Sequence, residues 1–381
     1  MKELNKKNKD NIFNNIKSKY ILKIIFNNLI LEKELRIINY NKNLQEKLDK
    51  DINDYKNYLK IEIEIIPEEK KYSKFFNASK NNESFYHVYL NDNKEEIKRN
   101  YINKDDNIQK IKLLIDFDIK SLNGLFKGCN CIKKIKFTKF KIKDINNMSN
   151  MFSGCSSLKE VDFSNVYSNN VVDMSYLFYY CIAIEKIDLS NLNTNNVTNM
   201  KFMFSGCLSL KNINFDNFNT NKVIDMSSMF NNCSSLKELD LSNFNTKNVR
   251  NMSSMFNYCS AFRELNVSNF NTNNVTDMSN MFYNCFSLRK LNLSNFNTNQ
   301  VTNMFYMFYR CSSLKELNLN NFNTYNVISM EHMFSGCSSL EVLNIDNFNT
   351  NNVTSMSAMF CRCYSLKKLI LIISILIMLL I

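Results

Sequence analysis

Hydrophobic positions recur along most of this chain with a fixed period of 26 residues. The clearest marker is a cysteine that returns at this spacing without a slip, at Cys129, Cys155, Cys181, Cys207, Cys233, Cys259, Cys285, Cys311, Cys337 and Cys363. A fixed period between about 20 and 50 residues is typical of stacked repeats, each of which buries one face on the next. The pattern therefore predicts a solenoid rather than a single compact core.

Two hydrophobic periodicities lie side by side within each repeat. Apolar residues from Val249 to Cys259 follow spacings of three, three, one and three, which predicts one face of a short helix. Leu239 and Leu241 alternate with polar residues, which predicts a short strand with one buried side. Residues that tolerate a left-handed backbone precede the cysteine in many repeats, namely Gly128, Gly154, Gly206, Gly336, Asn232 and Asn284. Each repeat is thus predicted to run helix, cap, strand, turn.

The repeated motif LxxLxL, followed by SNFNT, NV and MxxMFxxC, resembles the BspA-type leucine-rich repeat, and the resemblance covers about two thirds of the chain. It implies an α/β repeat fold: a right-handed leucine-rich-repeat solenoid with a short helix and a short parallel strand per 26-residue rung. Proteins of this family are often assigned to cell surfaces, adhesion or protein binding. One departure is that an asparagine such as Asn243 precedes a phenylalanine, Phe244, which holds the usual ladder position. We expect an inner aromatic spine and an asparagine ladder between turns.

The chain divides into five predicted segments, which are a disordered basic tail (1–10), a helical segment (11–50), a small α+β capping region (51–107), the solenoid (108–371) and an apolar tail (372–381). Helical spacing predicts two amphipathic helices, roughly 11–31 and 32–50, which we interpret as a helical cap; a membrane-surface helix and a partner-docking segment are alternatives.

The capping region carries two strand patterns, Ile61–Ile66 and Phe85–Leu90, and a charged stretch, Lys94–Asn100, with helical character. A degenerate first rung is expected from Ile111 onwards. The apolar tail is too short for a full membrane span, so it packs on the last rung, dips into a membrane or marks a truncated reading frame.

The net charge of +12 does not by itself indicate nucleic-acid binding. Asn, Lys and Ile dominate a composition with one proline, as an AT-rich genome would produce, which weakens any argument from lysine alone. A nucleic-acid surface requires a continuous basic face with interleaved aromatics, and the strand pattern predicts neither. We therefore predict no nucleic-acid partner.

The outward strand positions are instead acidic in most rungs. The candidate protein-binding residues are Glu160, Asp162, Asp188, Asp216, Glu238, Asp240, Glu264 and Glu316. The neighbouring column is mostly basic, with Lys159, Lys211, Lys237, Arg263, Arg289 and Lys315. Opposite charges in adjacent columns offset the repulsion within each column, so a simple solvated, striped surface is the alternative interpretation.

The cysteine column predicts buried free thiols, because cysteine is small and readily buried. Disulfides between rungs about 4.8 Å apart are the alternative. A zinc site is not expected, because the two C-x-C pairs, Cys129/Cys131 and Cys361/Cys363, lie nine rungs and about 43 Å apart. We predict no metal and no cofactor.

No catalytic motif occurs in the sequence. The only histidines are His87 and His332, and the chain has no glycine-rich phosphate loop, H-E-x-x-H or G-x-S-x-G. The prediction is a non-enzymatic leucine-rich-repeat protein that presents an extended surface to another protein, as an intracellular scaffold or adaptor. A surface protein or adhesin of the BspA type is the alternative, and an enzyme within 51–107 is a third class.

Several features of this predicted function stay open. The cysteines and the missing signal peptide favour the cytoplasm. Membrane association through the apolar tail is an alternative, and no pattern indicates an oligomer. The nearly identical rungs single out no patch for one ligand.

Overall fold

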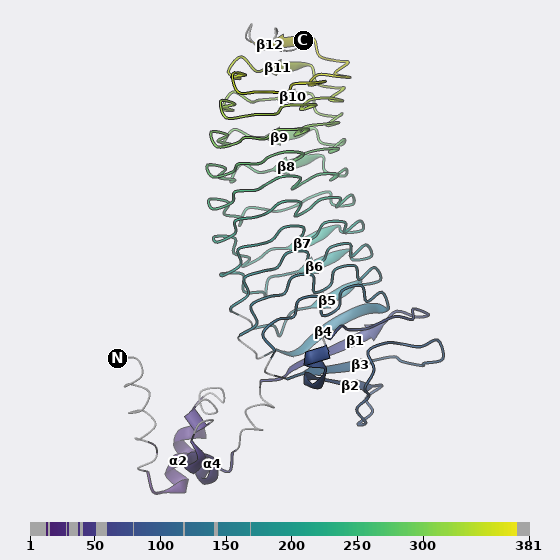
Figure 1. Cartoon of the computed structure of the whole chain (residues 1–381), viewed down its shortest axis with the longest axis vertical. Coiled ribbons are helices and arrows are strands. Elements are labelled where there is room, and N and C mark those ends of the chain that lie inside the picture. Colours follow the sequence, from purple (N-terminus) through teal and green to yellow (C-terminus); the bar gives the residue numbers. More distant parts are fainter. Residues whose placement is uncertain are drawn as a thin grey trace.

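Figure 1 shows the computed structural model of the chain, in which coiled rungs stack along the long axis. The structure describes residues 13, 16–27, 29, 37–38, 41–50, 59–78, 80–116, 119–140, 144–167 and 169–371. The predicted basic tail (1–10) and apolar tail (372–381) lie outside the described residues. No helix in the described part is long and apolar enough to cross a membrane.

The described part of the helical segment contains α2 (Lys19–Asn27) and α4 (Lys42–Leu48), which lie within the two predicted helices. The Asn41 side chain begins α4 by accepting a hydrogen bond from the Leu44 N–H at 3.2 Å. Two lysines, Lys19 and Lys23, reach the Asp49 carboxylate at 3.0 and 3.1 Å. Both helices bury apolar residues in a small core of their own, to which Ile38 also contributes. This core comprises Leu22, Phe26, Ile38, Leu44 and Leu48.

Five strands form the next sheet: β1 (Ile61–Pro67), β2 (Tyr86–Leu90), β3 (Ile111–Ile115), β4 (Ile132–Phe140) and β5 (Glu160–Asp162), with the short 3₁₀ helix η1 (Lys80–Phe85) before β2. Their order is β2-β3-β1-β4-β5. All pairs are antiparallel except β4 with β5. The strand predictions at 61–66 and 85–90 correspond to β1 and β2, and β4 joins these strands to the solenoid.

Two local expectations in this region differ from the structure. The stretch Lys94–Asn100 is not helical, because the Ile97 N–H bonds to the Val88 carbonyl at 2.9 Å and Arg99 forms a bidentate pair with Asp106 at 2.6 and 2.7 Å. Residues Ile111–Ile115 do not begin a rung. They form β3, whose alternating buried residues pair antiparallel with β1 and β2.

From β5 onwards the chain forms a repeat solenoid with one short strand in most rungs. These strands are β6 (Lys186–Asp188), β7 (Asn212–Asn214), β8 (Glu264–Asn266), β9 (Lys290–Asn292), β10 (Glu316–Leu317), β11 (Val342–Asn344) and β12 (Lys368–Ile370). Paired strands run parallel with a register of 26 residues, as Lys186 opposite Asn212 shows. The predicted parallel strand is therefore present, although the rung at 238–240 has no assigned strand.

The predicted helix in each rung is wrong: the described residues of the solenoid contain none. Overlapping turns replace it, because the Met255 and Cys259 N–H groups bond three residues back, to Met252 and Phe256, at 3.2 and 3.1 Å. Between them, the Phe256 N–H bonds to Met281 in the next rung at 3.0 Å, as the preceding Ser254 N–H does to Ser279 at 2.8 Å. In a helix, the N–H groups would form hydrogen bonds within their own rung. In the alternating turns, about half of the N–H groups bond instead to carbonyls of the next rung and so connect the rungs.

Turns of this kind require a left-handed residue at the third position. Every residue that precedes a periodic cysteine from Cys129 to Cys363 has positive φ, including Gly206 at 78° and Asn232 at 59°. A second left-handed residue lies four positions earlier, such as Ser254 at 56°. The glycine and asparagine signal thus identified the left-handed position correctly, but it belongs to a turn and not to a helix end.

The core is built from columns of identical residues. Phenylalanines from Phe126 to Phe360 stack with neighbouring ring centroids 5.2 to 5.9 Å apart. The expected inner spine is present too, because Phe244 and its equivalents in the later rungs are buried. All twelve cysteines are free, and ten of them are buried, which confirms the thiol prediction and excludes the disulfide alternative in this structure.

Each buried thiol in this column has a specific partner. The Cys259 Sγ donates to the Phe230 carbonyl of the preceding rung at 3.1 Å, and the same contact recurs from Cys155 to Cys363 at 2.9 to 3.2 Å. That carbonyl also accepts the N–H of Cys233 at 3.1 Å. The thiol therefore contributes a hydrogen bond between rungs in addition to filling a small buried space.

Thiol chemistry should report this arrangement directly. Because the thiolate is the reactive form, buried thiols should not react in the native chain at neutral pH. Cys361 is the only exposed cysteine of the twelve. Titration with a thiol-specific reagent should therefore give one rapid equivalent from Cys361, and twelve in denaturant. Rapid reaction of several native thiols would contradict the buried column, and a Cys361→Ser variant that still shows the rapid equivalent would contradict its assignment.

Two polar ladders also connect the rungs. The predicted asparagine ladder is present: the Asn269 side chain donates to the Leu241 and Phe244 carbonyls at 2.9 and 3.0 Å. A threonine ladder was not predicted. Thr246 Oγ1 donates to the Asn271 carbonyl at 2.9 Å and accepts from its N–H at 2.8 Å, and this reciprocal pair recurs from Thr194 to Thr324.

Replacing Thr246 by valine should destabilise the solenoid. Valine has nearly the shape of threonine but cannot accept the N–H of Asn271. Because the side chain at position 246 is fully buried, the loss of this hydrogen bond should lower the free energy of unfolding by about 1–3 kcal/mol. Urea unfolding followed by circular dichroism measures the loss. Thr276→Val is the matched control, because Thr276 is exposed, and its effect should stay within about 0.5 kcal/mol. Equal losses in the two variants would show that the ladder contributes nothing specific.

Candidate functional site

The acidic residues predicted to bind a partner all lie on the strand face of the solenoid, but several have structural roles. Asp162, Asp188 and Asp240 each accept the N–H of a serine two residues on, at 2.8 to 2.9 Å. Asparagine does the same in other rungs, as Asn214 does for the N–H of Asp216 at 2.9 Å. The hydrogen bond from Ser242 lowers the pKa of Asp240. These three aspartates therefore shape the turn after the strand.

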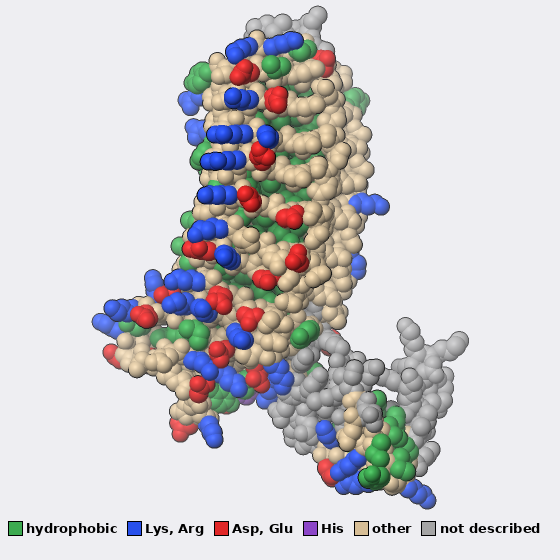
Figure 2. Space-filling view, turned by 180° about the vertical axis from the view of Figure 1, so that it is seen from behind, with side chains coloured by type: hydrophobic (Ala, Val, Ile, Leu, Met, Phe, Trp, Pro, Cys, Tyr) green, Lys and Arg blue, Asp and Glu red, His purple; other side chains and the backbone are tan. Residues whose placement is uncertain are grey.

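The glutamates of this face differ in their pairing. Glu160 contacts Lys134 at 2.6 Å, and Glu264 contacts Lys290 at 2.8 Å, each across one rung. The bond to Glu264 raises the pKa of Lys290. Glu238 and Glu316 are exposed and have no ion pair among the described residues. Figure 2 shows the resulting stripes, a column of Lys and Arg side chains beside acidic ones. The candidate face is partly neutralised by its own lysines.

A shallow hollow of about 600 Å³ lies on the strand face across β9, β10 and β11. Its lining includes Leu291, Leu317 and Glu316 between Arg289 and Asn344. Leucines at its base and charged groups at its rim are typical of a surface that can contact another protein. Glu316 is the one member of the predicted acidic set that lines it.

A different surface gathers aromatic side chains. On the run of turns that precedes each cysteine, consecutive rungs carry Tyr258, Tyr283, Tyr306, Tyr309 and His332, which we call the turn-face aromatic cluster. The Tyr283 and Tyr309 rings stack with centroids 4.7 Å apart, and Tyr306 stacks on His332 at 4.6 Å. Burial, with Tyr258 beside it, raises the pKa of Tyr283 to about 12. The four tyrosines of the cluster, together with the His332 ring, therefore form a platform of rings in mutual contact.

The cluster is only partly covered by protein. Tyr258 is 43% exposed, and Tyr283, Tyr306, Tyr309 and His332 are half-buried. The His332 Nδ1 is buried without a hydrogen-bond partner in the described structure. A smaller group of the same kind lies nearer the N-terminus, where Tyr176 stacks on Phe202 at 4.8 Å. Exposed tyrosines held by neighbouring rings are a frequent feature of protein-binding surfaces.

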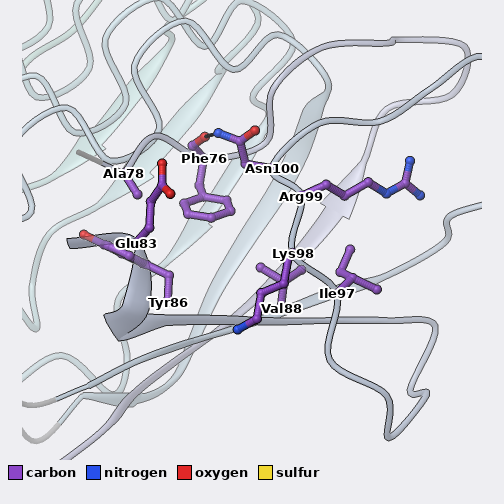
Figure 3. Close-up of a pocket in the computed structure, with 9 residues that line it drawn as sticks. All are labelled: Phe76, Ala78, Glu83, Tyr86, Val88, Ile97, Lys98, Arg99 and Asn100. Atoms are coloured by element: carbon purple, nitrogen blue, oxygen red, sulfur yellow. Dashed lines mark hydrogen bonds between the residues drawn. The ribbon is translucent and has the colours of Figure 1, made fainter. Parts of the chain in front are cut away.

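Figure 3 shows a pocket of about 170 Å³ beside β2, lined by Phe76, Ala78, Glu83, Tyr86, Val88, Ile97, Lys98, Arg99 and Asn100. It is smaller than the roughly 300–1,000 Å³ of ordinary ligand sites. Arg99 pairs with Asp106, and its guanidinium points away from Phe76 and Tyr86 (Figure 3). His87 is not part of its lining, and contacts Glu96 at 3.1 Å and Asp116 at 3.4 Å instead. Of the charged lining residues, Lys98 pairs with Glu96, which lies outside the lining.

The described residues contain no group of three or more His, Cys, Asp or Glu side chains that could hold a metal ion. Sequence reasoning about ligands concentrated on the columns that repeat, and it missed the aromatic cluster. The signal was present in the columns that vary. At the position two residues before the cysteine, Tyr283 and Tyr309 stand where neighbouring rungs carry the small polar residues Asn257 and Ser335.

One family model matches the chain in three overlapping stretches. Residues 120–238, 203–315 and 287–371 match the model of a family described as "Mycoplasma protein of unknown function, DUF285". No curated protein matches the sequence. One similar solved structure is a TLR13–ssRNA13 complex, at 18% identity and a TM-score of 0.28 over 62% of this chain and 32% of that chain. This chain thus spans about a third of the TLR13 chain.

Another similar structure is a leucine-rich repeat protein from Bacteroides ovatus ATCC 8483, at 17% identity and a TM-score of 0.24 over 69% of this chain and 84% of that chain. At these scores the two likenesses carry no argument about function. The solenoid is established by the stacking and the 26-residue register described above.

Proposed function

Because the chain belongs to the family described as "Mycoplasma protein of unknown function, DUF285", its function has to come from its own geometry, and we propose a non-enzymatic leucine-rich-repeat-like scaffold that binds another protein. The turn-face aromatic cluster is the observation that carries this proposal. It spans four consecutive rungs, from Tyr258 to His332, on a framework held by ladders of hydrogen bonds. A solenoid with one extended surface is suited to such a role.

The cluster resembles the energetic centre of a protein interface in its chemistry. Tyrosine combines a large apolar ring with a hydroxyl and loses little side-chain entropy on binding, so it is enriched at such centres. The rings already contact each other, which fixes them before a partner arrives. Tyr258 and Tyr306 also hold left-handed backbone positions, at φ 57°, which cost about 1–2 kcal/mol for a residue other than glycine. Glycine or asparagine holds the equivalent positions in other rungs, such as Gly206 and Asn280, at lower cost.

The strand face is the second candidate surface, supported by the exposure of Glu238 and Glu316. The antiparallel strands β1–β3 serve in this proposal as the cover of the first rung. The BspA-type resemblance keeps a surface protein or adhesin as the alternative to an intracellular scaffold. Both use the same binding chemistry, so the choice between them does not change which residues are tested.

Affinity capture with the full chain tests the proposal. The variant Tyr283→Ser/Tyr309→Ser carries the residue that Ser205 and Ser335 hold at the same position, so the rungs should fold normally. We expect the parent chain to retain specific proteins from lysates and the variant to lose them. The matched control, Glu238→Gln/Glu316→Gln on the strand face, should retain them.

Circular dichroism and the melting temperature show whether each variant is folded. Loss of the captured proteins in the glutamine control alone would move the site to the strand face. Undiminished capture by the folded serine variant, or no specific protein retained by the parent chain, would refute the proposal for the aromatic cluster.

A further inference from the structure

A hollow of about 480 Å³ lies beside the turn-face aromatic cluster. It is formed by the residues directly before and after the periodic cysteines, in the rungs of Cys259 to Cys363. Its lining is Tyr258, Asn284, Phe286, Arg310, Ser312, Gly336, Ser338, Arg362 and Tyr364. Phe286 is 51% exposed and Tyr364 is 80% exposed, and they come from rungs that are three repeats apart. Two aromatic walls therefore flank a floor of small residues, Ser312, Gly336 and Ser338.

The hollow carries two positive charges and no negative one. Arg310 and Arg362 are both exposed, and no residue of the lining is acidic. Some basic residues elsewhere on the solenoid pair with acidic ones, as Lys211 does with Glu185 at 2.7 Å and Lys367 does with Glu341 at 2.9 Å. The arginines of the hollow have no carboxylate partner among the described residues. A ligand that carries carboxylates therefore meets no competing carboxylate of the protein in this hollow.

Arg310 is also held in position. Its guanidinium carbon lies 5.2 Å from the centroid of the Tyr309 ring, within the range of a cation–π contact. Its stem lies over Gly336 of the next rung, where an added Cβ would come within 2.8 Å of the Arg310 Cγ. Glycine at this left-handed position thus makes room for the arginine. A guanidinium fixed in this way loses less entropy when it binds a carboxylate.

The spacing of the two arginines indicates the form of the ligand. They lie two rungs apart, and rungs paired like strands are about 4.8 Å apart, so their backbones are about 10 Å apart. A peptide in the extended polyproline II conformation advances about 3.1 Å per residue with three residues per turn, so two carboxylates three residues apart lie on one face and match this distance. The residues between them would face the walls formed by Phe286 and Tyr364. Carboxylates also suit the planar fork of arginine better than they suit lysine.

We infer that this hollow binds an extended acidic segment of a partner protein, with two carboxylates three residues apart on Arg310 and Arg362 and apolar side chains between the aromatic walls. The inference rests on the proposed protein-binding function and names the chemistry of the partner. A single-stranded nucleic acid would also use aromatic rings and arginine. It is less favoured because two arginines do not form a positive groove that follows a phosphate backbone.

Fluorescence anisotropy of labelled peptides with the full chain tests the inference. The probe is the peptide Ser-Glu-Trp-Leu-Glu-Ser, and the comparison peptides carry glutamine or lysine in place of both glutamates. We expect the glutamate peptide to bind at least tenfold more tightly than the glutamine peptide, the lysine peptide to bind more weakly still, and the difference to shrink as salt is raised.

The variant Arg310→Asn/Arg362→Asn should weaken binding of the glutamate peptide at least tenfold. Asparagine already occupies this position at Asn232 and Asn284 with φ of 59° and 57°, so the backbone should be preserved. The control variant Lys237→Asn/Lys315→Asn removes the same charge from the strand face and should bind normally. Equal binding of the glutamate and glutamine peptides, or an unchanged affinity of the arginine variant, would overturn the inference.

Tighter binding of a ten-nucleotide oligothymidine than of the glutamate peptide, lost in the arginine variant, would also overturn it and assign the hollow to nucleic acid. The peptide experiment can fail without refuting the proposed protein-binding function. If the serine variant of Tyr283 and Tyr309 loses captured proteins while the glutamate peptide does not bind, the scaffold function holds and the acidic-segment inference fails.

Discussion

Raising the pH from 8 to 10 is expected to unfold the solenoid at 25 °C. Burial raises the pKa of the thiols along the cysteine column, to about 12 for Cys155, Cys233 and Cys285, from an ordinary value of 9.0. The folded chain therefore keeps these thiols protonated, whereas the unfolded chain releases their protons above pH 9. The stability they support is complete below pH 9 and is lost as the pH rises towards 12.

The expected effect is large because the same group recurs in every rung. Each thiol that ionises only on unfolding lowers the free energy of unfolding by about 1.4 kcal/mol per pH unit above 9. Rungs of a solenoid unfold in contiguous groups, so four rungs that unfold together lose roughly 5 kcal/mol per pH unit. Urea unfolding at pH 7, 8, 9, 9.5 and 10, under reducing conditions, measures this slope.

The variant Cys259→Ala provides the control for the alkaline slope. It should be less stable at pH 7 by about 1–2 kcal/mol, because it loses the bond from Sγ to Phe230 and a small volume of packing. Above pH 9, however, its free energy of unfolding should fall less steeply than that of the parent chain, because unfolding of the variant releases one proton fewer. A stability that does not change between pH 8 and 10 in the parent chain would refute a buried thiol column.

Replacing Phe256 by alanine should lower the free energy of unfolding by about 3–5 kcal/mol. Phe256 is fully buried and lies between Phe230 and Phe282, with ring centroids 5.7 and 5.8 Å away. The edge of Phe262 contacts it at 6.3 Å. The substitution leaves a cavity in the middle of the phenylalanine stack and removes two stacked contacts. Because each rung is stabilised mainly by its neighbours, we expect the rungs on either side to uncouple and the urea transition to broaden or split.

Phe286→Ser is the matched control for this prediction. Phe286 belongs to the same rung as Phe282 but is 51% exposed, and serine occupies its position at Ser260 and Ser312. Its effect should stay within about 0.5 kcal/mol. A loss for Phe256→Ala that is no larger than for Phe286→Ser would show that the stacked rings are not the core of the solenoid.

The repeat architecture and its core columns could be predicted because they depend on local, recurring residues. A cysteine every 26 residues requires equivalent positions in successive rungs, and small, apolar, free thiols at those positions are buried. The positive φ before the cysteine followed from glycine and asparagine in many rungs, such as Gly206 and Asn232, although Tyr258 and Arg310 hold the same conformation. Glycine and asparagine indicate backbone conformations that do not depend on distant partners.

The helix in each rung could not be excluded from the sequence alone. The apolar spacing between Val249 and Cys259 fits one face of a helix, but it fits overlapping four-residue turns equally well. What decides between them is the destination of the N–H groups of Met252, Ser254 and Phe256, which bond to the next rung. That information is not local. The same limit applies to Ile111–Ile115, whose alternation is compatible with a rung strand or an antiparallel strand.

The candidate sites show a related limit. The exposed acidic positions of the strand face were identified by alternation, but the bond from Ser242 to Asp240 and the pair between Lys134 and Glu160 arise from the turn and from the neighbouring rung. The aromatic cluster was missed because Tyr283 and Tyr309 look like isolated exceptions in separate repeats. Only the stacking of rungs brings them within 4.7 Å of each other.

Pulsed electron paramagnetic resonance between two spin labels tests the stacking of rungs most directly. Labels at Val172→Cys and Thr354→Cys, in a Cys361→Ser background, occupy exposed equivalent positions seven rungs apart. Hydrogen bonds connect each rung to the next along this column, such as Thr198 N–H to the Val172 carbonyl at 2.9 Å. A rise of about 4.8 Å per rung predicts backbones about 34 Å apart. Packed helical repeats, about 8–10 Å apart, would give at least about 56 Å, and that result would contradict the account.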